Sequence, residues 1–263
     1  MQNIKGAKMD IISSESNLHI KHLKSLNEKK YRKFYGEFVL EGPKSVSEAL
    51  NAKTTIKEFF VSASKLDVYK QFLSLGIETV VVADKLFGKL TDTVSPQGIL
   101  AVAEMKPSGD FNPKSKPFIV LDRINDPGNL GTIIRSAVAT GFKDIVLIDC
   151  ADPYSPKTVR SSASGINFVN FYPLDYQTLI NKCDKGNIQI FVADMGGKDI
   201  FNASLPKENY CLVIGNEANG PSDKLKNSAD KILALPMEPE MESLNAGVCA
   251  SVMMYALAHF NKQ

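Results

Sequence analysis

The chain has 263 residues, of which 44% are hydrophobic and 23% are charged, and its formal net charge at pH 7 is +2. This composition is typical of a globular protein with enough apolar residues to fill one large domain or two smaller ones. The opening residues, MQNIKGAKMD, lack the apolar run of a signal peptide, and the apolar stretch over residues 246–260 is shorter than the about 20 residues that a membrane span needs. We therefore expect a cytoplasmic protein.

Positive charge is concentrated near the N-terminus. Residues 1–105 hold 15 basic and 12 acidic residues, whereas residues 106–263 hold 16 and 17. A predicted amphipathic helix over residues 16–34 contains a basic cluster in which Glu28 is the one acidic residue. The cluster consists of Lys21, Lys24, Lys29, Lys30, Arg32 and Lys33. It indicates a surface that contacts phosphate groups, although a solvated helix face would have the same composition.

The remainder of the first half alternates between short apolar strands and helices. We expect strands at Glu37–Glu41, Ile56–Val61, Thr79–Ala83 and Gly98–Glu104. Pro43 fits the first turn of a helix because its missing N–H costs nothing there, and Asp84 can cap another helix. The pattern predicts a small α/β domain over residues 1–105.

Residues 106–117 are rich in Pro, Ser, Gly and Lys and have no helical or strand period, which predicts a linker to a second domain over residues 118–263. In that domain, near-continuous apolar runs are typical of parallel strands buried on both faces. The runs are Phe118–Asp122, Ile145–Asp149, Ile188–Ala193, Tyr210–Gly215 and Lys231–Leu235. An amphipathic helix ends at Gly141 and a last helix covers residues 244–260, so we expect an α/β fold with a parallel sheet covered on both faces.

The chain has four cysteines: Cys150, Cys183, Cys211 and Cys249. No two of them form a C-x-x-C pair, and three lie within apolar runs, which indicates small core side chains in a reducing compartment. The histidines are distant from them in sequence: His19, His22 and His259. We therefore expect no metal site.

Ligands of parallel α/β sheets bind beyond the carboxyl ends of the strands, and three loops rich in Gly, Asn and Pro follow predicted strands. The first, residues 122–129, leads into a helix on which Arg135 lies off the apolar face, so that it can point over the strand ends. An arginine there can contact a phosphate bidentately, although a plain surface arginine would fit equally well. Gly128 and Gly131 do not complete the G-x-G-x-x-G pattern of a dinucleotide site.

The second loop, residues 214–222, places Glu217 between Asn and Gly residues directly after a buried strand. Its glycines permit close backbone approach to a ligand, while an Asn-Gly turn would account for the same residues. The third loop, residues 235–245, contains Ser243 and Asn245, either of which could cap the last helix. The N-terminus of a helix also offers free N–H groups to a carboxylate or a ribose.

These three loops, in this order, resemble the three motifs of the SpoU (TrmH-type) branch of the SPOUT RNA methyltransferases. The resemblance covers residues 118–263 and is carried by DPGNLGTIIRSAVATGF, LVIGNEANGPS and LPMEPEMESLNAGVCASVMMYAL. The first-half segment SNLHIKHLKSLNEKKYRKFYGEFVLEGPKSVSEAL is similar to the N-terminal substrate-recognition domain of many members, which has an RNA-binding, ribosomal-protein-like fold. Gly247 departs from the family pattern, where Ser is frequent, and so does Pro221, where Leu, Ile or Met is common.

The resemblance implies a catalytic domain with a deep trefoil knot that binds S-adenosylmethionine, in a homodimer with the site at the subunit interface. It implies catalytic roles for Arg135, Asn129, Glu217, Ser243 and Asn245. Contacts with the methyl donor are expected at Ile214, Gly215, Asn216, Leu235, Pro236, Met237 and Leu244. Contacts with RNA are expected at Lys29, Lys30, Arg32, Lys33, Lys157 and Arg160.

We therefore expect an RNA methyltransferase that transfers a methyl group to a ribose 2′-hydroxyl, with ribosomal RNA favoured by the separate N-terminal domain. Transfer RNA is the alternative substrate, and a non-catalytic RNA-binding protein of the same fold is the alternative function. The complete set of motif residues favours the enzyme. A nucleotide-binding enzyme of another kind is disfavoured because both G-x-G-x-x-G and G-x-x-x-x-G-K-[ST] are absent.

Overall fold

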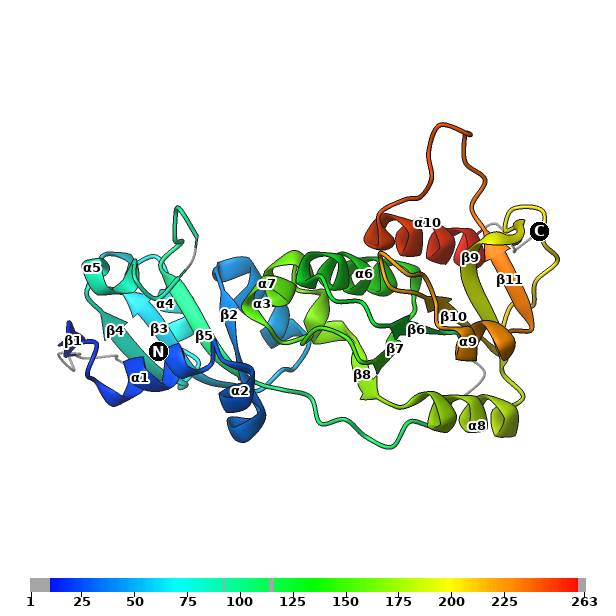
Figure 1. Cartoon of the computed structure of the whole chain (residues 1–263). Helices are drawn as coiled ribbons and strands as arrows, with labels where there is room; N and C mark the ends of the chain where they lie inside the picture. The colour runs from blue at the N-terminus through cyan, green and yellow to red at the C-terminus, as the bar shows by residue number, and fades with distance from the viewer. Residues whose placement is uncertain (1–9, 92, 114–115, 260–263) are drawn as a thin grey trace. The chain divides into compact units, whose positions relative to one another are not determined.

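The structure, a computed structural model, covers most of the chain (Figure 1). It describes residues 10–91, 93–113 and 116–259. Residues 1–9 of the predicted N-terminal domain, residues 114–115 of the predicted linker, and Phe260, the predicted end of the last helix, lie outside the described residues. In the described part, no helix is long and apolar enough to cross a membrane.

The chain divides into two compact units, each built around its own sheet. The N-terminal unit comprises Met1–Met105 and Tyr154–Pro156, and the C-terminal unit comprises Lys106–Pro153 and Lys157–Gln263. Each unit has its own hydrophobic core, as expected when each sheet is covered by its own helices.

The N-terminal unit contains a five-stranded mixed sheet. Its strands follow the order β1 (Ile11–Ile12), β4 (Glu78–Val82), β3 (Ile56–Ser62), β5 (Ile99–Glu104) and β2 (Glu37–Glu41). β5 runs antiparallel to both of its neighbours, and the other pairs are parallel. The four strands predicted for this half are confirmed to within one residue at either end. Sequence patterns do not predict β1, because two residues are too few to show a period.

Helices cover both faces of this sheet. They are α1 (Leu18–Ser25), α2 (Lys29–Tyr35), α3 (Pro43–Asn51), the 3-10 helix η1 (Ala63–Lys65), α4 (Lys70–Leu73) and α5 (Asp84–Phe87). α1 and α5 share an apolar cluster with Phe60 of β3, and α4 lies on the opposite face, where the Phe72 ring is 6.0 Å from that of Phe59. Pro43 begins α3 as predicted. Asp84 does not cap a helix; it lies inside α5 and accepts a hydrogen bond from the backbone of Ser64.

The single helix predicted over residues 16–34 is wrong, because the chain forms two helices, α1 and α2, separated at residues 26–28. The interruption allows the side chain of Leu26 to be fully buried. Nη1 of Arg32 donates a hydrogen bond to the carbonyl oxygen of Leu26 at 2.7 Å. The Leu26 carbonyl group lies at the end of α1, where carbonyl groups have no partner within the helix, and Arg32 supplies that partner.

Arg32 is therefore a structural residue. It is only 3% exposed, so its guanidinium does not face the solvent. The expectation that Arg32 contacts RNA is therefore wrong, because its guanidinium is hydrogen-bonded to the carbonyl oxygen of Leu26. Lys29, Lys30 and Lys33 are exposed, and Nζ of Lys30 pairs with Oε2 of Glu28 at 3.0 Å.

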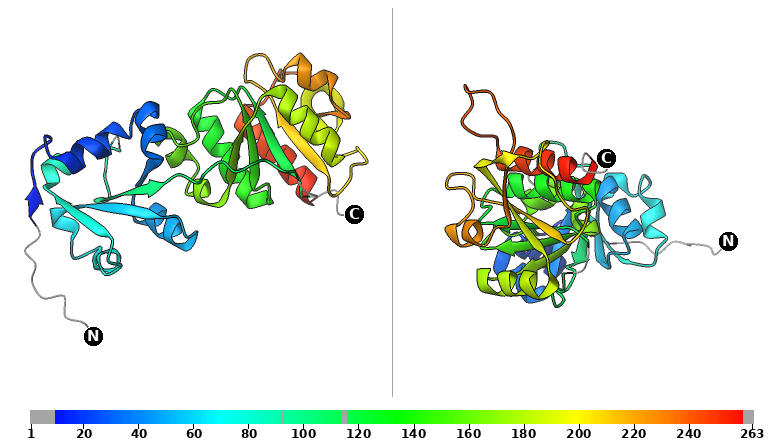
Figure 2. Two further views of the ribbon diagram at one scale, coloured as in Figure 1. Left: turned by 90° about the horizontal axis from the view of Figure 1, so that it is seen from below. Right: turned by 90° about the vertical axis from the view of Figure 1, so that its right-hand side faces the viewer.

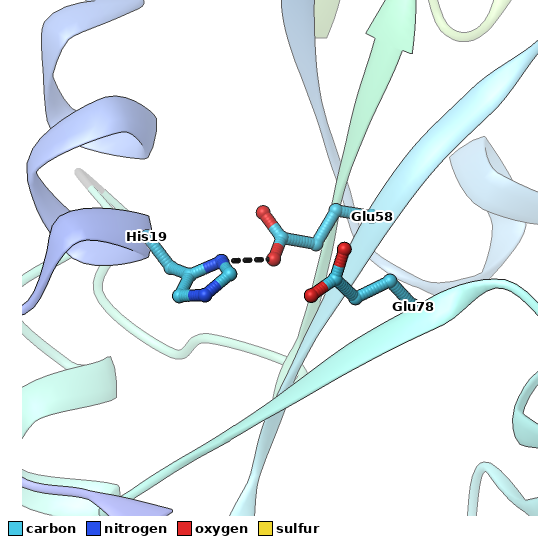
Figure 3. A group of neighbouring side chains, drawn as sticks. All are labelled: His19, Glu58 and Glu78. Carbon is cyan, nitrogen blue, oxygen red and sulfur yellow. Dashed lines mark hydrogen bonds and ion pairs between the residues drawn. The ribbon is translucent and has the colours of Figure 1, made fainter.

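α1 is attached to the sheet by two pairs of histidine and glutamate side chains. His19 Nδ1 lies 2.5 Å from Oε1 of Glu58, and His22 Nε2 lies 2.7 Å from Oε2 of Glu37. Glu58 and Glu78 occupy paired positions on β3 and β4, and Figure 3 shows both carboxyl groups on the side that faces His19. Burial raises the pKa of Glu58 above its usual value, and the neighbouring His19 opposes this effect. These contacts fix one end of α1 over the sheet.

The C-terminal unit contains a six-stranded sheet in which all neighbouring strands are parallel. The strand order is β11 (Lys231–Ala234), β9 (Gln189–Asp199), β10 (Tyr210–Ile214), β6 (Phe118–Asp122), β7 (Asp144–Ile148) and β8 (Asn170–Pro173). The five predicted strands are confirmed, although β9 continues for several residues beyond its predicted end and pairs there with β11. Sequence patterns do not predict β8, because this edge strand is half polar and ends in a proline.

Helices cover both faces of this sheet as well. They are α6 (Pro127–Thr140), α7 (Pro156–Ser161), the 3-10 helix η2 (Gly165–Phe168), α8 (Tyr176–Gly186), α9 (Asp223–Asn227) and α10 (Ala246–His259). α6 and α10 lie side by side on one face, and α8 lies on the other (Figures 1 and 2). Leu179 of α8 and Leu225 of α9 share one apolar cluster with the sheet. The predicted parallel sheet with two covered faces is confirmed, and the trefoil knot stays a prediction.

α6 and α7 approach each other closely at Gly131. This glycine is buried, and a Cβ atom there would lie 2.7 Å from Cβ of Ser161 and 2.8 Å from the backbone nitrogen of Ser162. The Ser161 hydroxyl donates to the carbonyl oxygen of Pro127 at 3.2 Å, which links α7 to the first turn of α6. At its other end α6 stops at Gly141, whose φ of +88° ends the helix as predicted.

We predict that Gly131→Ala lowers the free energy of unfolding by about 1–3 kcal/mol, because the added methyl group must push α7 away from α6. Urea denaturation followed by circular dichroism measures the change. Gly109→Ala is the matched control, since a Cβ atom at Gly109 would have no other atom within 4 Å. Equal stability of the two variants would contradict the close approach of the helices.

Candidate active site at the carboxyl ends of the strands

A cavity of about 520 Å³ lies at the carboxyl ends of β10 and β11, beside the extended part of β9 and the beginning of α10. This is the edge where parallel α/β sheets bind their ligands. Eight predicted site residues line the cavity: Ile214, Gly215, Asn216, Glu217, Leu235, Met237, Ser243 and Leu244. Pro236, Asn129, Arg135 and Asn245 are not among the lining residues. The structure thus brings the second and third predicted loops together around one cavity.

Asn129 joins the first loop to the other two. Its Oδ1 accepts a hydrogen bond from Nδ2 of Asn245 at 2.9 Å, and its Nδ2 donates to Oε1 of Glu217 at 2.9 Å. The three residues are far apart in sequence, and each comes from a different loop. One side chain from every predicted loop therefore belongs to a single hydrogen-bonded chain.

Asn245, rather than Ser243, caps α10. Its Oδ1 accepts hydrogen bonds from the backbone N–H groups of Gly247 at 2.9 Å and Val248 at 3.2 Å. These are N–H groups that have no partner within the helix. A Cβ atom at Gly247 would lie 3.2 Å from Thr132 of α6, so the glycine that departs from the family pattern brings the two helices close together.

Asp122 and Arg123 hold the second loop from the end of β6. Asp122 is fully buried, and its carboxyl group accepts hydrogen bonds from the backbone N–H of Ser222 at 2.6 Å and from Nε of Arg123 at 3.0 Å. This hydrogen bond raises the pKa of the Arg123 guanidinium. Nη2 of Arg123 reaches the carbonyl oxygen of Gly220 at 3.2 Å. Sequence reasoning missed both residues, although they begin the first predicted loop.

The second loop folds back on itself so tightly that its backbone forms a wall of the cavity. A Cβ atom at Gly215 would lie 2.5 Å from Cα of Pro221. Asn216 and Gly220 form a backbone bridge, and Gly220 has a φ of +64°. Glycine is therefore required at residue 215 because no side chain fits there, and at residue 220 because its backbone is left-handed.

The cavity also contains a charged pair that the sequence analysis did not identify. Oδ2 of Asp194 lies 2.5 Å from Nζ of Lys226, and both residues line the cavity. The hydrogen bond from Lys226 holds the pKa of Asp194 below its usual value. The segment after the predicted strand Ile188–Ala193 is rich in glycine, so the search for loops at strand ends could have found this pair.

Arg135 lies on α6, away from the cavity lining. Its side chain is exposed and forms no hydrogen bond or ion pair with any residue that the structure describes. On the adjoining α7, Lys157 pairs with Asp126 at 3.1 Å and Arg160 is exposed. Asp126 also accepts a hydrogen bond from the backbone of Asn129, and this bond contributes most to its lowered pKa. The structure therefore does not bring Arg135 into the cavity of its own chain.

Comparison with known families decides where this chain belongs. Residues 116–255, more than half of the chain, match the SpoU rRNA Methylase family. The chain belongs to this family. Residues 17–101 match the MRM3-like substrate binding domain. Both resemblances that the sequence analysis identified are thereby confirmed.

The SpoU-type similarity extends over nearly the whole chain. A relative in Bacillus subtilis, the 23S rRNA (guanosine(2553)-2′-O)-methyltransferase RlmP, is 29% identical over 95% of this chain and 99% of its own. The 23S rRNA (uridine(2479)-2′-O)-methyltransferase of Streptomyces viridochromogenes is 27% identical over 84% of this chain and 82% of its own. The AdoMet-bound rRNA methyltransferase of Sinorhizobium meliloti has a TM-score of 0.84 at 26% identity, over 95% of this chain and 97% of that chain. This likeness confirms the predicted α/β fold.

Two substitutions of Asn245 distinguish its two interactions, which are the N-cap of α10 and the hydrogen bond to Asn129. Asn245→Ala should lower the free energy of unfolding by about 0.5–2 kcal/mol, because α10 loses its N-cap. Asn245→Asp should retain most of that stability, since a carboxylate also accepts from the N–H groups of α10, but it cannot donate to Asn129. Urea denaturation measures both variants. An equal loss in the two would show that the cap contributes little.

Proposed function

We propose that this SpoU-family protein transfers a methyl group from S-adenosylmethionine to a ribose 2′-hydroxyl of ribosomal RNA. The observation that carries the proposal is the hydrogen-bonded chain of Asn245, Asn129 and Glu217, which joins the three family motifs beside one cavity. Two relatives that match over more than four fifths of both chains are named 23S rRNA 2′-O-methyltransferases, which favours ribosomal over transfer RNA. The intact motif residues speak against a non-catalytic protein of the same fold.

The cavity fits the methyl donor in size and in chemistry. Its volume of about 520 Å³ falls within the range of about 300–1,000 Å³ that is usual for small-molecule sites. Leu235, Leu244 and Met253 give it apolar walls, and the residue-215 backbone can approach a ligand because no Cβ intervenes. The lining residues that would hold the donor are Ile214, Gly215, Asn216, Leu235, Met237 and Leu244, and Pro236 lies between two of them in sequence. When bound, the sulfonium donor supplies an electrophilic methyl group next to a good leaving group.

The chain's own residues must then align and activate the 2′-hydroxyl, which is a weak nucleophile. Arg135 would hold the neighbouring phosphate and stabilise the negative charge that develops on the 2′-oxygen. Arginine side chains are poor proton acceptors in general, so this proposal assigns proton removal to another group. Asn129, Ser243 and Asn245 would position the ribose and the donor carboxylate, and Glu217 would order the second loop. This chemistry uses no metal ion.

The exposed face of α10 supports a homodimer. Three apolar side chains lie on it at positions i, i+4 and i+7: Val248, Val252 and Tyr255, which are 46%, 38% and 45% exposed. Such a stripe is typical of a helix face that another chain covers. In the proposed dimer, a second copy of this chain covers the stripe. The dimer would also bring Arg135 of one subunit to the cavity of the other, since Arg135 does not line its own.

In this proposal, residues 1–105 form the RNA substrate-binding domain, residues 106–117 the linker and residues 118–263 the catalytic domain. Lys29, Lys30 and Lys33 of the N-terminal unit, with Lys157 and Arg160 of the C-terminal unit, would contact RNA phosphates. These contacts position the RNA without reading its sequence.

The proposal predicts that Arg135→Ala retains donor binding but loses methyl transfer. Transfer should fall at least about 100-fold, as when one charge-stabilising donor is removed from an active site. The measurement incubates the protein with S-adenosylmethionine labelled in its methyl group and with unmodified ribosomal or transfer RNA, then locates the label after digestion. Calorimetry checks donor binding, and Arg135→Lys, which keeps the charge but loses the bidentate contact, serves as the matched variant.

Label at a 2′-O position of ribosomal RNA is the expected result. Label in transfer RNA alone would contradict the assignment of ribosomal RNA as the substrate. Full activity of Arg135→Ala would contradict the role of this arginine. A wild-type protein that neither binds the donor nor transfers label would support the non-catalytic alternative.

We also predict that Val252→Glu converts the dimer to a monomer, because a charge in the centre of an apolar interface must be desolvated without a partner. Sedimentation velocity measures the mass, and methyl transfer should fall with it as each cavity loses its second subunit. Val68→Glu is the control, since Val68 is a 61% exposed valine of the N-terminal unit. A monomeric Val252→Glu protein with full activity would contradict a shared site.

A further inference from the structure

The surface of α2 carries exposed aromatic rings to which the proposed function assigns no role. The α2 aromatic surface consists of Tyr31, Phe34 and Tyr35. Phe34 is 78% exposed and Tyr35 is 45% exposed. An aromatic ring that lies mostly in water adds little to the core, whereas exposed aromatic rings are frequent where a protein binds a ligand. Their exposure therefore points to binding rather than to folding.

These rings have a defined mutual arrangement. The Tyr35 ring lies 4.9 Å from that of Phe34 at an angle of 84°, and 6.4 Å from that of Tyr31 at 22°. It also lies 4.6 Å from the ring of His22, and His22 is hydrogen-bonded to Glu37 of β2. Tyr35 is thus anchored to α1 and the sheet, and Phe34 packs against it. A planar ligand can stack on rings that are already ordered with a small loss of side-chain entropy.

Lysines share α2 with these rings. Lys29 and Lys33 are exposed. Nζ of Lys30 lies 4.6 Å from the centre of the Tyr31 ring and 3.0 Å from Oε2 of Glu28. Positive charges beside aromatic faces complement a single nucleic-acid strand, in which phosphates alternate with bases. A protein partner would need no such alternation of rings and cations.

We propose that α2 binds an unpaired stretch of RNA, with bases stacked on Phe34 and Tyr35 and phosphates beside Lys29 and Lys33. This inference rests on the proposed function and names the part of the RNA that the N-terminal unit recognises. Bases within a duplex are already stacked on one another, so they cannot stack on Phe34. The α2 aromatic surface therefore selects loops, bulges or strand ends over helical RNA.

The natural chain contains no tryptophan, which allows a direct test. Phe34→Trp introduces a single tryptophan at the proposed stacking position, and a base that stacks on it quenches its fluorescence. The probes are an unstructured RNA of about 12 nucleotides, within the usual site size for a single strand, its duplex, and an abasic strand of equal length. Val94→Trp is the control, because Val94 is an exposed residue of the same unit outside the α2 aromatic surface.

We expect quenching of Phe34→Trp by the unstructured RNA, with little quenching by the duplex or the abasic strand, and no quenching of Val94→Trp. Quenching of Phe34→Trp to the same extent by all three probes would show an effect of phosphates and overturn the proposal. Equal quenching of both variants by the unstructured RNA would also overturn it, because no stacking position would be distinguished.

The affinity of the same RNA provides a second readout. Phe34→Ala should weaken binding about 5- to 150-fold, the usual effect of removing one stacked aromatic ring. The dependence of binding on salt should stay unchanged in this variant, whereas Lys33→Ala should reduce its slope by about one. Val94→Ala should bind as the wild type does. If Phe34→Ala binds the RNA with wild-type affinity, the proposal is overturned. If, in addition, the sedimentation of Phe34→Ala differs from that of the wild type, the α2 aromatic surface is a contact between protein chains instead.

The two proposals fail in different ways. If the wild type transfers methyl groups but Phe34→Ala binds the unstructured RNA normally, only the stacking proposal is wrong. If the wild type transfers no methyl group to any RNA, the proposed function is wrong, while the quenching and affinity experiments still decide whether α2 stacks on bases.

Discussion

The buried carboxyl group of Asp122 is the constraint on which the active-site end of the C-terminal unit depends. A buried carboxyl group is costly unless it is hydrogen-bonded, and Asp122 is fully buried. It accepts hydrogen bonds from the backbone of Ser222, the hydroxyl of Tyr176 and the guanidinium of Arg123. These partners come from the loop after β10, from α8 and from the next residue of the chain. Because one side chain needs all of them, the end of β6, the second loop and α8 are fixed relative to one another.

The arrangement of the cavity follows from this constraint. α6 begins shortly after Asp122, and its N-cap Asp126 fixes the backbone of Asn129, whose side chain then reaches Glu217 and Asn245. The side chains of Asn129, Glu217 and Asn245 are thus hydrogen-bonded to one another. Arg135 differs from them, because its guanidinium is exposed and forms no hydrogen bond or ion pair within the described part of the chain. A charge without an internal partner is suited to a phosphate from outside the chain.

The sequence predicted those features that depend on local pattern. The buried strands of both sheets are apolar runs, so their positions were predicted to within a few residues, and Gly141 ended α6 as expected. The break between α1 and α2 could not be predicted, because it depends on Arg32 turning back to Leu26, a tertiary contact with no local signal. The loops of the cavity were predicted from strand ends. Their connection through Asn129 was not, since a hydrogen bond across 116 residues leaves no periodic trace.

The two units can contribute different kinds of recognition. Phosphate contacts by lysines hold any RNA and weaken as salt rises, because they release counterions. Such contacts alone cannot choose one ribose among the many of a ribosomal RNA, since every nucleotide has a phosphate. Stacking on Phe34 and Tyr35 would add a contact that distinguishes unpaired from paired strands and depends far less on salt. The target would then be chosen by the coincidence of an unpaired stretch at α2 and a ribose at the cavity, so that neither unit has to read a long base sequence by itself.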